Sequence, residues 1–113
     1  MDKLPIQQGE IYWADLNPAK GHEQAGERPV LIVQNNLLNR NLNTTIVAPI
    51  TTNIGAKGLI TTFWISKRED LKSDSVALFY QMRTIDKIRL KNRAAQLNSE
   101  ELNQVKMQLS LLF

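Results

Sequence analysis

Short apolar runs recur along most of the chain, and segments rich in glycine, proline, asparagine or charge separate them. Several runs alternate apolar with polar residues or are rich in β-branched and aromatic side chains, which predicts strands. The strands predicted in this way cover residues 10–16, 28–34, 44–51, 59–66 and 74–81. Residues 82–90 are predicted to continue as a strand and a turn, and residues 93–97 are a candidate last short strand, which gives five to seven strands in all. Residues 30–33 are apolar without a break, so we expect that strand to be buried on both faces.

Three finer expectations follow from the same pattern. Pro49 predicts a bulge or an edge position, because proline lacks the N–H that a central strand donates. Val76, Leu78 and Tyr80 are two residues apart and should share one face of their strand. Residues 35–43 are polar and rich in asparagine, which indicates a turn or a short helical bend.

The periodicity changes near the C-terminus, where apolar residues recur at helical spacing. Asn98 followed by Glu101 resembles a capping box, and the spacing then places these residues on one helix face: Leu102, Val105, Leu109 and Leu112. We expect a helix of three to four turns that packs on the sheet. The fold class is therefore mainly β with a C-terminal helix, a small and strongly curved sheet or barrel. A length of 113 residues predicts a single domain, residues 1–113.

Composition removes several classes of site. The chain has no cysteine, which excludes disulfides, thiolate metal sites and cysteine nucleophiles. With one histidine and no tight carboxylate group, we expect no metal and no cofactor. Neither a nucleophile elbow, nor a phosphate-binding glycine loop, nor a dinucleotide fingerprint is present. No apolar run reaches the length of a membrane span and the N-terminus lacks a signal-peptide core, so we expect a cytoplasmic protein with no membrane partner.

Positive charge is concentrated late in the chain, although the net charge is only +3. Eleven consecutive residues that contain one acid, Asp86, carry five cations: Arg83, Lys87, Arg89, Lys91 and Arg93. Such a segment suits a phosphate backbone or an acidic protein segment. It equally suits a solvated surface.

The connection between the first two predicted strands is the strongest candidate for a site. Residues 21–30 contain the only histidine, two carboxylates, two glycines and an Arg-Pro pair, and the connection is longer than a simple strand turn needs. RNA cleavage is a reaction that so few groups can support, because the substrate supplies its own 2′-hydroxyl nucleophile. An arginine fork and a threonine hydroxyl at a strand end suit the phosphate. DNA lacks the 2′-hydroxyl and would be rejected.

Four motifs, in the same order, resemble the MazF/PemK/Kid toxins, the mRNA interferases of type II toxin–antitoxin modules. They are GEIYWADLNP at 9–18, GHEQAGERPVLIV at 21–33, IVAPIT at 46–51 and QMRTIDK at 81–87. The resemblance implies a compact SH3-like β-barrel that works as a homodimer. It implies metal-independent cleavage of single-stranded RNA, by 2′-hydroxyl attack, to 2′,3′-cyclic phosphate and 5′-hydroxyl ends. It also implies a cognate antitoxin whose acidic C-terminal tail blocks the RNA site.

The resemblance assigns roles residue by residue. Arg28 and Thr51 match the catalytic arginine and threonine of the family. Residues expected to orient substrate or assist catalysis are His22, Glu23, Gln24, Thr52 and Gln81; those expected to contact RNA are Gly21, Arg83 and Lys57.

His22 has the most suitable intrinsic pKa for proton transfer. Relatives that use this histidine carry an arginine and an aspartate just before the QxRTID motif, where this chain has Leu78-Phe79-Tyr80, so His22 is a secondary candidate. Phe63 and Trp64 lie near the loop expected to touch RNA, where base stacking is weighed against packing.

Two other functions remain open. A toxin of the same fold, of the CcdB type, poisons DNA gyrase by protein binding and has no nuclease site. An inactive homologue would bind nucleic acid without cutting it. The Arg-Pro-Val and Ile-Thr motifs together favour the nuclease.

Overall fold

The computed structural model describes residues 5–17, 21 and 26–113. Within them lie seven strands: β1 Glu10–Asp15, β2 Glu27–Ile32, β3 Thr44–Thr51, β4 Thr62–Ile65, β5 Ser75–Leu78, β6 Arg83–Asp86 and β7 Leu90–Gln96. The helices are α1 Asn36–Asn41 and α2 Ser99–Leu112, and the 3-10 turns are η1 Ile54–Ala56, η2 Phe79–Gln81 and η3 Lys87–Arg89. Neither described helix is long and apolar enough to cross a membrane.

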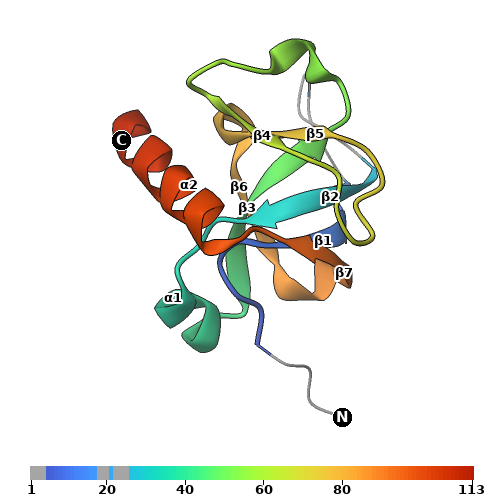
Figure 1. Ribbon diagram of the computed structural model, residues 1–113. Coiled ribbons are helices and arrows are strands. Elements are labelled where there is room, and N and C mark those ends of the chain that lie inside the picture. The colour runs from blue at the N-terminus through green and yellow to red at the C-terminus, as the bar shows by residue number, and fades with distance from the viewer. Residues whose placement is uncertain (1–4, 18–20, 22–25) are drawn as a thin grey trace.

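All strand pairs are antiparallel, and the sheet runs in the order β4-β5-β3-β2-β1-β7. β3 has β2 along one edge, while on its other edge the first half pairs with β6 and the last two residues pair with β5. Figure 1 shows the strands curving around one another with α2 lying to one side. The arrangement is barrel-like, although no pairing between β4 and β7 closes the described sheet. It confirms a mainly β fold with a C-terminal helix.

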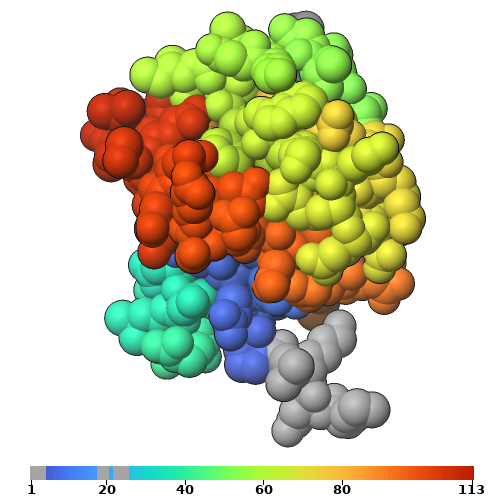
Figure 2. Space-filling model, viewed as in Figure 1, coloured from blue at the N-terminus to red at the C-terminus, as the bar shows by residue number. Residues whose placement is uncertain are grey.

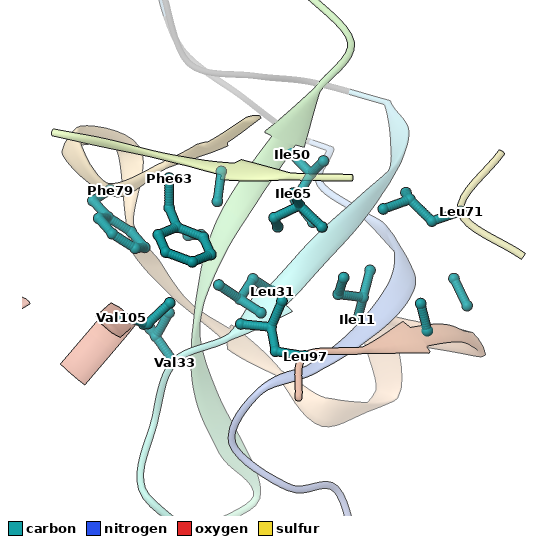
Figure 3. Close-up of a cluster of buried hydrophobic side chains, with 14 residues drawn as sticks. Ile11, Leu31, Val33, Ile50, Phe63, Ile65, Leu71, Phe79, Leu97 and Val105 are labelled. Carbon is teal, nitrogen blue, oxygen red and sulfur yellow. The ribbon is translucent and has the colours of Figure 1, made fainter. Parts of the chain in front are cut away.

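The middle of the sheet is buried on both faces, because alternate residues of the central strands enter two different cores. In β2, Leu31 enters the larger core, whereas Val30 and Ile32 enter the smaller one. Figure 3 shows the larger core, where side chains from β2, β3 and β4 meet Val105 of α2. The unbroken apolar run of β2 is thus buried on both sides, as the sequence predicts.

A capping box starts α2 as the sequence predicts. Asn98 Oδ1 accepts a hydrogen bond from the backbone N–H of Glu101 at 2.8 Å, and Glu101 Oε1 accepts one from the N–H of Asn98 at 2.9 Å. At the next turn Leu102 packs on Gly9, whose φ is +92° and whose missing Cβ would lie 3.2 Å from the leucine. The sheet and α2 therefore approach as closely as they do because residue 9 has no side chain.

Three local predictions need correction. The strand expected at residues 74–81 ends at Leu78, where the chain tightens into η2, so Tyr80 is 58% exposed and does not share a face with Val76. The strand expected at 59–66 begins only at Thr62. Pro49 lies in a central strand, opposite Val30, at the point where the neighbour on the other edge changes from β6 to β5.

Candidate active site at the ends of β2 and β3

Arg28 and Thr51 lie near the neighbouring ends of β2 and β3. The pairs Ile32–Val47, Leu31–Ala48 and Val30–Pro49 define the register of β2 and β3. β2 extends beyond Val30 to Glu27 and β3 extends beyond Pro49 to Thr51, so the same register, if continued, would put Arg28 opposite Thr51. Because directly opposite residues project from the same face of a sheet, the two side chains leave the same face. This register is compatible with one phosphate site shared by the two residues, whose catalytic roles stay predictions.

The surroundings of Thr51 leave its hydroxyl able to donate. Thr51 Oγ1 accepts a hydrogen bond from the backbone N–H of Asn53 at 3.1 Å. A hydroxyl has one donor and two acceptor sites, so this bond fixes the oxygen and leaves the hydrogen available for an incoming anion. Thr51 is partly exposed, and on the next strand it faces the buried Val76.

Arg28 lies second in β2, opposite Ala14 of β1, and is partly exposed. It also borders an open hollow of about 450 Å³ whose lining includes Trp13, Thr52 and Lys72. Ile50 and Thr52 line this hollow from the face of β3 opposite to Thr51. Thr52 therefore approaches Arg28 from a different side than Thr51 does.

Two arginines from later in the chain hold the end of β1 and the residues that follow it. Arg83 Nη1 donates to the carbonyl of Leu16 at 3.1 Å. Arg89 Nη1 donates to the carbonyl of Asp15 at 3.3 Å and to that of Asn17. Charged donors make the stronger class of hydrogen bond to a carbonyl. We refer to these contacts of Arg83 and Arg89 as the arginine clamp.

The clamped segment is tied directly to the start of β2. The N–H of Leu16 donates to the carbonyl of Gly26 at 3.0 Å, and the N–H of Gly26 donates to Asn17 Oδ1 at 3.1 Å. Gly26 precedes Arg28 by two residues and has a φ of +79°. The clamp thus reaches Arg28 through the backbone. Sequence reasoning missed Arg89 and Asn17; the only signal for Arg89 was its place in the basic segment.

The remaining candidate residues fall into three groups. His22, Glu23 and Gln24 lie outside the described residues, so their roles stay predictions. Gly21 is exposed, with a φ of +58°, and Gln81 is a partly buried residue at the end of η2. Arg83 belongs to the clamp, and the ammonium of Lys57 lies 4.2 Å from the ring centre of Trp64.

The basic segment is mostly engaged within the protein. Besides the clamp, Lys87 Nζ donates to the carbonyl of Asn39, and Arg93 bonds Glu10 at 2.9 Å and Glu69 at 3.4 Å. These partners lie on different elements, so the five cations do not form one free surface. Among the described residues, no group of three or more histidine, aspartate or glutamate side chains is placed to hold a metal ion.

Comparison with known proteins places this arrangement in a family. The family model described as "PemK-like, MazF-like toxin of type II toxin-antitoxin system" matches residues 7–113. Endoribonuclease EndoA of Bacillus subtilis (strain 168) is 44% identical over 109 residues, which are 94% of each chain.

Solved structures of MazF proteins resemble this fold. MazF (Form-I) from Deinococcus radiodurans superposes with a TM-score of 0.76 at 25% identity, covering 97% of both chains. MazE-MazF (Form-II) from the same organism gives 0.71 at 25% identity, covering 97% of this chain and 96% of the other. The chain belongs to the PemK-like, MazF-like toxins of type II toxin–antitoxin systems.

Proposed function

We propose that this MazF-like endoribonuclease toxin cleaves single-stranded RNA at short sequences, without a metal ion, through attack of the 2′-hydroxyl on the neighbouring phosphate. The observation that supports the proposal is the register of β2 with β3, which, extended beyond Val30–Pro49, puts Arg28 and Thr51 on the same face. Two donors on adjacent strands suit one phosphate, because neighbouring strands are only about 4.8 Å apart.

The bond changes balance without a co-reactant. The 2′-oxygen loses its proton and bonds to phosphorus, the bond from phosphorus to the 5′-oxygen breaks, and that oxygen takes up a proton. The products are a 2′,3′-cyclic phosphate and a 5′-hydroxyl. Arg28 binds two non-bridging oxygens with its planar fork, and the Thr51 hydroxyl donates a further bond. Both bonds strengthen as negative charge builds on these oxygens, which lowers the barrier.

Proton transfer is assigned to other groups. Arg28 is assigned to binding the phosphate through its planar fork. His22 and Glu23 are the candidates for moving protons, with Gln24 and Gln81 orienting the substrate and with Thr52, Gly21 and Arg83 beside it. The 2′-hydroxyl requirement makes DNA a non-substrate.

We also propose that the toxin acts in the cytoplasm as a homodimer and is neutralised by a cognate antitoxin with an acidic C-terminal tail. The MazE-MazF complex of Deinococcus radiodurans supports an antitoxin partner of the MazE kind. The net charge of +3 favours an acidic partner.

The test is cleavage of a long single-stranded RNA in EDTA, followed by mapping of the ends. We expect cyclic phosphate and 5′-hydroxyl ends from the wild type. Arg28→Ala and Thr51→Val should each lower the rate by about 100-fold or more, which is typical of losing one donor to a developing oxyanion. Thr51→Ser, which keeps the hydroxyl, should restore most of the activity.

Matched controls come from the same elements and residue types. Thr44→Val changes a threonine at the other end of β3, and Arg40→Ala removes an exposed arginine of α1. Both should cleave like the wild type. Intact RNA together with inhibited DNA gyrase would identify a gyrase poison instead. Intact RNA that is retarded in a gel would identify a binding protein without nuclease activity.

A further inference from the structure

Trp64 lies in the same cross-strand row as the proposed phosphate-binding residues. It pairs with Val76 of β5, and Val76 pairs with Thr51 of β3. Extending the register of β3 with β2 beyond Val30–Pro49 continues the row to Arg28. Since directly paired residues share a face, Trp64, Thr51 and Arg28 all project from one face of the sheet. Two strand spacings separate the α-carbons of Trp64 and Thr51, about 10 Å.

The structure separates Trp64 from its aromatic neighbour. Phe63 is 9% exposed, belongs to the larger core and stacks on Phe79 with ring centres 6.3 Å apart. Trp64 is next along the strand and therefore points to the opposite face, where it is partly exposed. Packing accounts for Phe63. It leaves the exposed part of the Trp64 indole unexplained.

A lysine lies over the Trp64 ring. Lys57 follows η1, and its ammonium is 4.2 Å from the ring centre. The segment that carries it arches over β4 and β5 and forms a ridge along the top of the molecule (Figures 1 and 2). Thr62 Oγ1 anchors this segment through the carbonyls of Ala56, at 2.7 Å, and Leu59, at 3.1 Å. Gly58, with a φ of +90°, follows Lys57 directly.

We propose that Trp64 is a stacking platform for a nucleobase of the RNA, on a nucleotide close to the cleaved phosphate. In the free protein Lys57 covers the indole. When RNA binds, the base takes the place of the ammonium on the ring, and Lys57 moves to a backbone phosphate. Aromatic side chains and cations are the two groups with which proteins hold single strands. This inference rests on the proposed RNA cleavage and adds a binding subsite to it.

Replacing the ammonium by a base on the ring is favourable, because the indole and the Lys57 ammonium each form a stronger contact than they have with one another. A lysine over a partly solvated indole is a weak contact, whereas a stacked base covers more of the ring. The released ammonium then meets a phosphate, its preferred partner in nucleic-acid complexes. Trp64 contributes binding rather than chemistry, so its removal should raise KM and leave kcat nearly unchanged.

Kinetics provide the first test, with an RNA oligonucleotide that spans one mapped cut site. Trp64→Leu should raise KM by about 5- to 100-fold, the range for losing one stacked base, and Trp64→Phe should recover much of the loss. Phe113→Leu is the matched control, because it makes the same kind of change at an exposed residue after α2 and should leave KM unaltered. A KM for Trp64→Leu equal to that of the wild type overturns the proposal.

Fluorescence provides a second test that does not depend on the leucine variant folding. The probe is the same oligonucleotide with a 2′-deoxy sugar at the attacking position, which binds and cannot be cleaved. The chain has two tryptophans, so the wild type is compared with Trp64→Phe. We expect binding to quench the wild type and expect this quenching to be lost in Trp64→Phe. Equal quenching in both proteins, or none in either, contradicts stacking on Trp64.

Salt dependence tests the part assigned to Lys57. Lys57→Gln should reduce the slope of log Kd against log salt by about 0.7, the value for one lost phosphate contact on a single strand. Lys106→Gln, at an exposed lysine of α2, should leave the slope unchanged. The proposed RNA cleavage and the proposed stacking site can be refuted separately. A wild type that cleaves no RNA refutes the proposed function, whereas normal cleavage with no effect of Trp64 refutes only the stacking site.

Discussion

Replacing Glu101 with glutamine removes one charge from the contact that holds the start of α2. Arg68 binds this carboxylate in bidentate fashion, through Nη1 to Oε1 and through Nη2 to Oε2 at 2.7 Å. The side chains are only 19% and 20% exposed. Arg68 also donates to the carbonyl and the hydroxyl of Ser66, so its guanidinium is held in place. The pair therefore joins α2 to the connection that follows β4.

The expected loss in the free energy of unfolding lies between two limits. Exposed ion pairs contribute about 0.2–1 kcal/mol, and breaking a fully buried pair costs about 3–5 kcal/mol. For a pair that is four-fifths buried, we expect Glu101→Gln to cost about 1.5 kcal/mol, because glutamine at this position still completes the capping box. Glu101→Ala also loses the cap and should cost about 2.5 kcal/mol. For a domain of this size, the glutamine variant should melt about 6 °C lower.

The cost should depend on pH in a defined direction. The hydrogen bond from Arg68 lowers the pKa of Glu101 below its ordinary value of 4.5, against burial, which raises it. A lowered pKa in the folded state stabilises the protein above the unfolded value. That stabilisation disappears as the pH falls through the folded value. The difference between the wild type and Glu101→Gln should therefore be largest near neutral pH and shrink below pH 4.5.

Urea unfolding followed by circular dichroism measures both effects. The matched control is Glu100→Gln, which removes the same charge from the same helix turn at an exposed side chain. It should cost no more than about 0.5 kcal/mol, the size of a helix-dipole effect. Equal losses for the two variants, or a loss at Glu101 that persists undiminished in acid, would refute the reasoning.

Three further predictions concern the site and its support. Arg89→Met should lower kcat/KM by about 10-fold, since the end of β1 that supports Arg28 loses two hydrogen bonds. Lys91→Met should have no effect, and equal kcat/KM values for the two variants would contradict the positioning role of Arg89. Arg28→Lys keeps the charge but not the fork and should lower kcat by about 100-fold in the RNA assay, with near-wild-type turnover as the contrary result. Gly9→Ala should lower the free energy of unfolding in urea by about 1–2 kcal/mol, because the φ of residue 9 is +92° and Leu102 is 3.2 Å from the added carbon. An unchanged urea midpoint would argue against strain at this position.

Patterns formed by neighbouring residues predicted the bounds of some strands and the start of the C-terminal helix. The bounds of β3 and the capping box of α2 agree with the sequence because alternation and capping depend on adjacent residues. Tyr80 was placed wrongly because alternation continued in the sequence after the backbone had turned into η2.

Long-range contacts were beyond such reasoning. The bonds of Arg83 and Arg89 to the end of β1 span 67 and 74 residues, and no local pattern records them. The basic segment therefore looked like one surface, when most of its cations are partners of distant carbonyls and carboxylates. The roles of Arg28 and Thr51 remain predictions from the family motifs, and their placement on one face follows from extending the register of β2 and β3.

The divided edge of β3 has a consequence for how the protein opens. One strand provides the ladder partners for β2, β5 and β6, so neither part of the sheet can separate without breaking bonds to β3. We therefore expect the amide hydrogens at the centre of β3 to exchange with solvent only through global unfolding. Thr51 ends this strand, while Arg28 lies one residue inside its own. Because the end of a strand opens more readily than its centre, the amide of Thr51 should exchange sooner than those at the centre of β3.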